Sequence, residues 1–401
     1  MNATRKYLAY LLVLVLLPLC AAAQDIQETQ PEPPVSGPVQ FTYVLLPDGT
    51  VEITGCEGDP AELFIPAQVD GHPVTAIGAK AFAGLEKLTA ATFPEGVIRI
   101  GEDAFRRCFA LENVSLPTTL REIGNYAFAS CFRLAEIALP EGLLHIGDEA
   151  FCYDALTEAT LPRSLESMGV NPFNDCEALK KLTVARGNPV FEVKGGALYH
   201  KESKTLLCVP GGMEKKTFRV KKGTQVIGQS AFSRNGHFEK IVLPKTVSTI
   251  CPHAFESCDL LREINIPEGI GIIPHRAFYL CDDLRQVSLP EGLHTIEERA
   301  FDSCFDLPSI ALPSTVTVIG ESSFNRCLAL TGMVLPESLV SIGEYAFSEC
   351  SLLGSVSIPE SVTDIGEGAF ALCSPDLTVT AAPGSFAESW AADNGLPCVN
   401  P

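Results

Sequence analysis

Apolar residues recur along most of the chain with a period close to 23 residues. Each period holds an alternating stretch such as LENVSLP (111–117), followed by an apolar residue, usually isoleucine, that precedes a phenylalanine by five positions. Alternation of apolar and polar residues is typical of a β-strand. The proline at its end has no backbone N–H to donate, so it ends the strand and turns the chain. Each period therefore predicts a strand, a corner and a short second segment.

A phenylalanine marks every period. Neighbouring phenylalanines stand 23 residues apart, except for 22 between Phe151 and Phe173 and 59 between Phe173 and Phe232. Cysteine follows three residues after the phenylalanine in nine periods, and leucine usually follows at six. Apolar residues at steps of three predict one helical or 3₁₀-like turn. The twelve marker residues are Phe82, Phe105, Phe128, Phe151, Phe173, Phe232, Phe255, Phe278, Phe301, Phe324, Phe347 and Phe370.

These periods predict a solenoid, because one period cannot bury its own apolar face and must stack on its neighbours. Strands in a sheet lie about 4.8 Å apart, so twelve coils would extend on the order of 60 Å. The expected fold has stacked coils of about 23 residues with a parallel β-sheet, short second strands and single helical turns. Identical residue types should form buried rows.

The two flanks of the repeat predict caps. FTYVLLPDGTVEIT (41–54) has two alternating runs around a turn, which predicts a β-hairpin. GSFAESWAADNGLP (384–397) predicts a short helix whose Phe386 and Trp390 would cover the last coil. The predicted segments are a signal peptide (1–23), a disordered proline-rich linker (24–39), an N-terminal β cap (40–74), a first repeat block (75–184), an irregular hairpin-bearing coil (185–222), a second repeat block (223–380) and a C-terminal cap (381–401).

The repeat resembles a known family. The offsets L-x-x-[IV]-x-[LI]-P-x-x-[LV]-x-x-I-G-x-x-A-F-x-x-C, over about residues 75–380, are similar to the BspA-like, or treponemal-type, leucine-rich repeat. The A-F-x-x-C portion belongs to this subclass, and the asparagine ladder of commoner leucine-rich repeats is absent. The resemblance implies a leucine-rich-repeat solenoid in a secreted or cell-surface protein that mediates protein–protein or protein–glycan interaction, of an adhesion type toward host matrix or cell surfaces. Two alternatives are a structural envelope spacer without a specific ligand and a secreted hydrolase.

Residues 1–23 have the features of a signal peptide. Arg5 and Lys6 precede an apolar run (8–19) that is too short to span a bilayer, and small residues lead to a predicted cut after Ala23. A lipoprotein carrying its lipid on Cys20 is the alternative, but a leucine stands where that signal requires a small residue. No later stretch has the roughly 18 apolar residues of a membrane helix. The sequence predicts a secreted or extracellular surface protein without a transmembrane segment after signal removal.

Charge excludes one class of partner and indicates another. The chain has 46% hydrophobic residues and a formal net charge of −20, so we do not expect it to bind nucleic acid. Residues 177–222 are the exception, with 11 basic residues against 4 acidic ones. This segment predicts a site for an anionic glycan or an acidic protein patch, with a solvated charge cluster as the alternative. The candidate partner-binding residues are Lys215, Lys216, Arg219, Lys221 and Lys222.

No catalytic residue, cofactor site or metal site is predicted. The nine cysteines at one repeat offset would stack about 4.8 Å apart, whereas a disulfide needs Cβ atoms near 3.8 Å, so buried thiols are favoured over disulfides or a metal. His253 and His275 precede their phenylalanines at different offsets and need not align. Glutamates after the corner prolines predict a solvated acidic ridge rather than a calcium site. We therefore expect no enzymatic activity, and the outward strand positions from Thr92 to Ser357 form a second candidate binding face.

Overall fold

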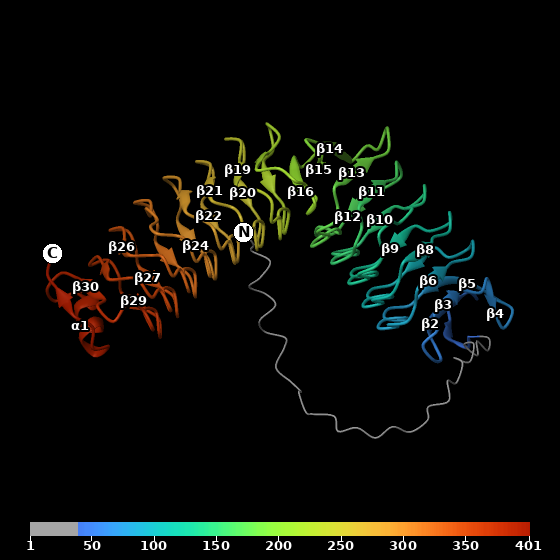
Figure 1. The fold of residues 1–401 in the computed structure, drawn as a ribbon, viewed down its shortest axis with the longest axis horizontal. Coiled ribbons are helices and arrows are strands. Elements are labelled where there is room, and N and C mark those ends of the chain that lie inside the picture. The colour runs from blue at the N-terminus through green and yellow to red at the C-terminus, as the bar shows by residue number, and fades with distance from the viewer. Residues whose placement is uncertain (1–38) are drawn as a thin grey trace, which may run out of the picture. The chain divides into compact units, whose positions relative to one another are not determined.

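The computed structural model describes residues 39–401, and Figure 1 shows successive coils of this unit lying side by side in chain order. The predicted signal peptide, the alternative lipid site at Cys20 and residues 24–38 of the predicted linker lie outside the described residues. Across residues 39–401, no helix has the length and apolar character needed to cross a bilayer.

The alternating stretches form a first strand row, all of it parallel. It consists of four sheets, in the orders β3-β6-β8, β11-β13, β17-β19-β21-β23 and β26-β28-β30-β31. The strands are β3 (Glu62–Phe64), β6 (Ala90–Thr92), β8 (Asn113–Ser115), β11 (Glu158–Leu161), β13 (Lys181–Val184), β17 (Thr217–Arg219), β19 (Lys240–Val242), β21 (Glu263–Asn265), β23 (Gln286–Ser288), β26 (Gly332–Val334), β28 (Ser355–Ser357), β30 (Thr378–Thr380) and β31 (Cys398–Val399).

The isoleucine segments form a second strand row, which is also parallel from coil to coil. Its strands are β2 (Val51–Cys56), β5 (His72–Ile77), β7 (Arg99–Ile100), β9 (Glu122–Ile123), β10 (His145–Ile146), β12 (Ser167–Met168), β16 (Thr205–Cys208), β18 (Val226–Ile227), β20 (Thr249–Ile250), β22 (Ile272–Ile273), β24 (Thr295–Ile296), β25 (Val318–Ile319), β27 (Ser341–Ile342) and β29 (Asp364–Ile365). In both rows a residue pairs with its repeat equivalent, as Ile77 pairs with Ile100 and Ile100 with Ile123. The predicted solenoid and its rows of identical residues are confirmed.

The phenylalanine row forms the centre of the core. Phe105, Phe128 and Phe301 are fully buried, and neighbouring rings stack in near-parallel pairs such as Phe278 and Phe301, with centroids 5.1 Å apart and planes at 3°. Offset stacking of this kind adds roughly 0.5–1.5 kcal/mol per pair beyond the burial of apolar area. The regular spacing of one phenylalanine per coil therefore produces a continuous column of rings within each block.

The segment around each phenylalanine is not the helical turn that the spacing predicts. Residues two before and two after the phenylalanine have left-handed φ values, for example 55° at Asp103 and 62° at Arg107 around Phe105. A helix requires negative φ throughout and keeps its hydrogen bonds within one segment. Here the backbone N–H groups of Asp103, Phe105 and Arg107 donate instead to carbonyl oxygens of the next coil, at 2.7–2.9 Å. Consecutive turns replace the helix because stacking satisfies the backbone between coils.

The cysteine row forms a ladder of thiols. Each of the nine Sγ atoms lies 3.0–3.4 Å from the carbonyl oxygen of the phenylalanine in the preceding coil, as Cys108 does from Phe82. Burial raises the pKa of the Cys108 thiol to about 12. All fourteen cysteines in residues 39–401 are free, and eight of the nine in the row are buried, with Cys373 partly exposed. The predicted burial of the row is confirmed for eight of its nine thiols.

Each end of the solenoid carries an element that the coils lack. Strand β1 (Phe41–Leu45) pairs antiparallel with β2 as a hairpin. Helix α1 (Phe386–Asp393) starts at Ser385, whose hydroxyl accepts a hydrogen bond from the Glu388 N–H, and it places Trp390 with its ring centroid 5.5 Å from that of Phe370. Phe386, in contrast, remains 43% exposed, because Ala387 and Ala391 are the buried residues of this helix. Its predicted role in covering the last coil is wrong.

The 59-residue interval between Phe173 and Phe232 contains an irregular coil. Strand β15 (Ala197–His200) pairs antiparallel with β14 (Phe191–Lys194) on one side and with β16 on the other, and β16 then pairs in parallel with β18. A smaller strand, β4 (Gln68–Val69), pairs antiparallel with β5 near the N-terminal cap. Leu198 packs in the core of the preceding coils, whereas Ala197 and Tyr199 pack in the core of the following ones. The hairpin therefore joins two apolar cores.

A buried asparagine closes the corner that leads into this coil. Asn188 stands where other corners have an apolar residue such as Leu165, and it is buried. Its Nδ2 donates to the carbonyl oxygens of Pro162 and Leu165 at 3.0 and 2.9 Å, and its Oδ1 accepts the N–H of Val190 and Phe191 at 2.8 Å. The Asn188 side chain thus provides hydrogen-bond partners for the backbone of the preceding corner and for Val190 and Phe191 at the start of β14. These bonds fix the point at which the hairpin leaves the repeat.

Candidate anion-binding site

The five candidate residues from the sequence surround β17 and are all exposed. Lys215 and Lys216 precede this strand, Arg219 ends it, and Lys221 and Lys222 lie at the corner that follows. The structure does not bring them into one cluster. They divide between the start of the first strand row and the next corner.

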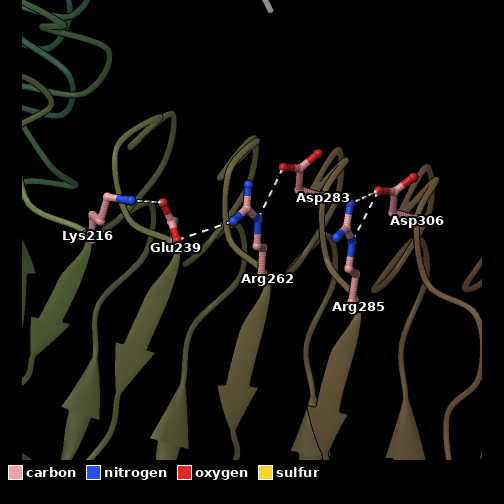
Figure 2. Close-up of polar contacts among 6 residues, drawn as sticks. All are labelled: Lys216, Glu239, Arg262, Asp283, Arg285 and Asp306. Atoms are coloured by element: carbon pink, nitrogen blue, oxygen red, sulfur yellow. Dashed lines mark hydrogen bonds and ion pairs between the residues drawn. The ribbon is translucent and has the colours of Figure 1, made fainter. Parts of the chain in front are cut away.

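Lys216 is the first residue of a ladder of ion pairs, so its charge is already paired. The Lys216 ammonium lies 2.8 Å from Glu239, and the hydrogen bond it donates lowers the pKa of that carboxyl. Figure 2 shows the ladder continuing with alternating charge across neighbouring coils as far as Asp283, followed by a separate pair of Arg285 and Asp306, with contacts of 2.7–3.6 Å. Such exposed pairs contribute little stability each, but they neutralise one another. The ladder and the separate pair comprise Lys216, Glu239, Arg262, Asp283, Arg285 and Asp306.

The corner at the other end of β17 forms a basic pocket. It faces the turn between β15 and β16, and the two segments enclose a pocket of about 220 Å³. Four lysines from two parts of the chain line it, although only two of them were among the candidates from the sequence. The lining residues are Tyr199, His200, Lys201, Lys204, Lys221, Lys222, Gly223 and Thr224.

Hydrogen bonds hold the backbone of this pocket in place. The buried Tyr199 hydroxyl accepts the N–H of Lys221 at 3.2 Å, and the Thr224 hydroxyl donates to the Lys221 carbonyl oxygen at 2.8 Å. The Lys204 carbonyl oxygen accepts the N–H of Gln225 at 2.9 Å, which joins the two sides. The ammonium groups therefore extend from a fixed frame.

The pocket keeps a positive charge after its internal pairs are counted. Lys221 forms an ion pair with Glu192, and the Lys201 ammonium contacts the Asn188 carbonyl oxygen. The hydrogen bond from Lys221 and the nearby charges of Lys221, Lys194 and Lys201 lower the pKa of Glu192. Lys204 and Lys222 form no ion pair with any residue in 39–401. Two cations are thus available to a ligand.

The pocket lies where the acidic ridge of corner residues changes sign. Corner positions are glutamates in several coils of both blocks, but they are basic on both sides of the irregular coil. The Lys222 and Lys245 corners touch, because the Thr246 hydroxyl donates to the Thr224 carbonyl oxygen at 2.6 Å. The basic run consists of Arg163, Arg186, Lys222 and Lys245, bounded by Glu141 and Glu268.

Sequence reasoning placed Lys201 and Lys204 in the basic segment but did not assign them to the site. Lys204 and Lys222 are 18 residues apart, which is not a multiple of the repeat, so the period gives no sign that they meet. The available signal was the pair of strand-like runs around Gly195-Gly196, which indicates a hairpin. The turn between β15 and β16 brings Lys204 to the corner that holds Lys222.

A second pocket, of about 320 Å³, is lined by Lys80, Asp103, Arg106 and Arg107, but Asp103 pairs with Lys80 and Arg106 and offsets their charge. The offsets of His253 and His275 did not require them to align, yet their ring centroids are 5.2 Å apart. His253 pairs with Glu256, and His275 lies 3.6 Å from Glu298. Burial lowers the pKa of His275. No group of three or more histidine, cysteine, aspartate or glutamate side chains in residues 39–401 is arranged to hold a metal ion.

The outward face of the first strand row is small and mostly neutral. Thr92 pairs with Ser115, and Val242, Asn265 and Ser288 pair in succession, so the positions predicted from the sequence do form rows. Aromatic and arginine residues, which dominate binding hot spots, occur in register with this row at Phe64, which pairs with Thr92, and at Arg219, which pairs with Val242. This face offers less for a partner to hold than the basic pocket does.

Comparisons with known proteins agree with this architecture. A parallel solenoid with one phenylalanine, one thiol and two short strands per coil belongs to the leucine-rich-repeat class. The chain is a member of the BspA type Leucine rich repeat region family, whose model matches residues 74–198, 213–331 and 271–388. The predicted family is thereby confirmed. A comparison with curated proteins finds no match.

Several solved structures share the fold. A leucine rich cell surface protein from Faecalibacterium prausnitzii is 25% identical, with a TM-score of 0.61 over 76% of this chain and 94% of that one. A leucine-rich repeat protein from Eubacterium ventriosum is 23% identical, with a TM-score of 0.70 over 84% and 93%. The pneumococcal vaccine antigen PcpA is 19% identical, with a TM-score of 0.64 over 91% and 98%. The last two show the fold alone.

Proposed function

We propose that this protein is exported and acts as an adhesion-type interaction protein, binding an anionic partner through its irregular coil. The partner is a negatively charged glycan or an acidic protein surface. The observation that carries the proposal is the charge of residues 177–222, where seven of the 11 basic residues form no ion pair with any residue in 39–401. The seven are exposed: Arg186, Lys194, Lys201, Lys204, Lys215, Arg219 and Lys222.

Electrostatics support this location over any other part of the chain. The chain has a formal net charge of −20 while this segment contributes an excess of seven basic residues, so the remainder is more acidic still. A polyanion is repelled by most of the surface and attracted to one part of it. Family membership adds support for an extracellular interaction role, since the Faecalibacterium relative is described as a cell surface protein.

A charge-neutralising variant tests the proposal. Replacing Lys215, Arg219 and Lys222 with Gln removes three cations without leaving a carboxylate unpaired, whereas Lys216 and Lys221 are left intact because they pair with glutamates. Binding to a sulfated glycan or an acidic matrix protein should weaken by at least about tenfold, as expected when charge-assisted contacts are lost. Binding of the parent protein should also weaken steeply with added salt, since exposed charges are screened within about 8 Å at physiological ionic strength.

The matched control removes the same charge elsewhere. Replacing Lys87, Arg107 and Arg133 with Gln takes three exposed cations from the first block, two of which pair with the exposed carboxylates of Asp59 and Glu112, and should leave binding within about threefold of the parent. Equal weakening by both variants would mean that only net charge matters. A parent protein that binds nothing on a broad array of glycans and matrix proteins would favour the spacer alternative instead.

A further inference from the structure

We propose that the pocket between the β15–β16 turn and the corner at residues 221–224 binds a sulfate group of a sulfated glycan chain, with the rest of the chain lying along the basic corners. This inference rests on the proposed function and names the ligand class. The pocket is about 220 Å³, which is below the roughly 300–1,000 Å³ of drug-sized ligand sites. It has room for one charged substituent and part of a sugar ring rather than for a protein loop.

The chemistry of the lining favours a tetrahedral oxyanion over a planar carboxylate. All the cations are lysines, and no arginine lines the pocket. Arginine presents a planar fork that matches a carboxylate, whereas the lysine ammonium is a point charge with three rotatable donors. Lys204 and Lys222 approach from opposite segments and are free of ion pairs within the described part of the chain. Together they can hold an oxyanion from two sides.

The cations continue as a track across neighbouring segments. The Arg186 corner contacts the β15–β16 turn, because the N–H of Lys201 donates to the Val190 carbonyl oxygen at 2.9 Å and the Lys201 ammonium contacts the Asn188 carbonyl oxygen. The other side of that turn is bonded to the Lys222 corner, which in turn touches the Lys245 corner. The track therefore passes through Arg186, Lys201, Lys204, Lys222 and Lys245.

The shape of this track indicates a linear ligand. Neighbouring strands are about 4.8 Å apart, so the track extends on the order of 20 Å. The next corner beyond Arg186 is also basic, at Arg163, and acidic corners at Glu141 and Glu268 then end the basic run on its two sides. A short sulfated oligosaccharide fits a narrow basic line whose flanking glutamates would repel a longer anion. An acidic protein has a wider surface, so it would also meet those glutamates.

Two double variants distinguish binding in this pocket from attraction of the glycan to the basic segment as a whole. Lys204→Gln with Lys222→Gln removes the two unpaired cations of the pocket, and Lys215→Gln with Arg219→Gln removes two unpaired cations beside β17. Binding is measured by calorimetry with a heparin oligosaccharide, with the same oligosaccharide after desulfation, and with hyaluronan, whose only charges are carboxylates. Thermal unfolding of both variants confirms that the fold is retained.

The pocket pair should weaken heparin binding at least about tenfold and the β17 pair less than about threefold. Desulfated heparin and hyaluronan should bind at least about tenfold more weakly than heparin. Equal loss in the two double variants overturns the pocket while leaving the proposed function standing. Equal binding of hyaluronan overturns the assignment to sulfate. If heparin fails to bind while an acidic protein binds through the same segment, the proposed function stands and the glycan inference does not.

Discussion

Asp154 is the one acidic residue in the cysteine row, where Leu85 and Asn235 also replace cysteine, and its protonation should make stability depend on pH. It stands three residues after Phe151, where nine other coils have cysteine, and is only 3% exposed. Its Oδ1 accepts the N–H of Cys131 at 2.8 Å, but its Oδ2 has no partner among residues 39–401. The titratable groups around it are the thiols of Cys131, Cys152 and Cys176. Burial raises the pKa of Asp154 well above its usual value.

The geometry of the row agrees with a protonated carboxyl. Each thiol in the row donates to a carbonyl oxygen in the preceding coil, and Asn235, in the same row, donates its Nδ2 to the Val209 carbonyl oxygen at 3.2 Å. Asp154 can supply the equivalent bond only as an acid, through a proton on Oδ2. Ionisation would leave a buried carboxylate with one hydrogen bond and no cation, which is strongly unfavourable.

The sign of the effect follows from proton linkage. An unfolded aspartate titrates near pH 3.9, so above that pH the unfolded chain loses a proton that the native chain keeps. The native state then binds one more proton, and the free energy of unfolding falls by about 1.4 kcal/mol per pH unit until the native pKa is reached. Asp154→Asn removes this term, and Asp154→Cys restores the residue of the row. As the pH rises from 5, both variants should gain stability relative to the parent, by up to about 1.4 kcal/mol for each pH unit that lies below the native pKa of Asp154.

Urea unfolding of the parent and both variants at pH 5, 6 and 7 measures the difference directly. Burial also raises the pKa of Asp259 to about 6, but that group is present in all three proteins and cancels in the comparison. Stability curves that stay parallel across this range would show that Asp154 is ionised in the native protein. The row would then not require a donor in every coil.

Two further predictions concern the core. Phe301→Ala should lower the free energy of unfolding by about 3–5 kcal/mol, because the fully buried ring stacks between Phe278 and Phe324 and a coil held on both sides cannot close the cavity. A loss below about 1 kcal/mol in urea unfolding would contradict the phenylalanine column. Titration with a thiol reagent should modify the ten buried cysteines only in denaturant, since burial keeps their thiols inaccessible, and disulfides found by mass spectrometry would refute this. The four partly exposed thiols should react in the native protein: Cys56, Cys251, Cys373 and Cys398.

The sequence was sufficient to predict the solenoid because its contacts are set by the period. When equivalent residues stack, the partner of a residue is the residue one period later. The contacts of Ile77 with Ile100, and of Cys108 with the coil of Phe82, can therefore be predicted from the period alone. Apolar residues at one offset must share a row, which also predicts that the thiols are buried. Charge composition locates the excess of basic residues at 177–222, and the binding of an anion there stays a prediction.

The tertiary structure decided the backbone conformations and contacts that do not follow from the 23-residue period. The turn around each phenylalanine takes left-handed φ values instead of a helix, because its N–H groups bond to the next coil, and spacing within one coil cannot reveal this. His253 and His275 meet although their offsets differ. Lys204 and Lys222 line one pocket only because a hairpin of no fixed period folds back onto a corner, and that contact depends on how the two cores are joined.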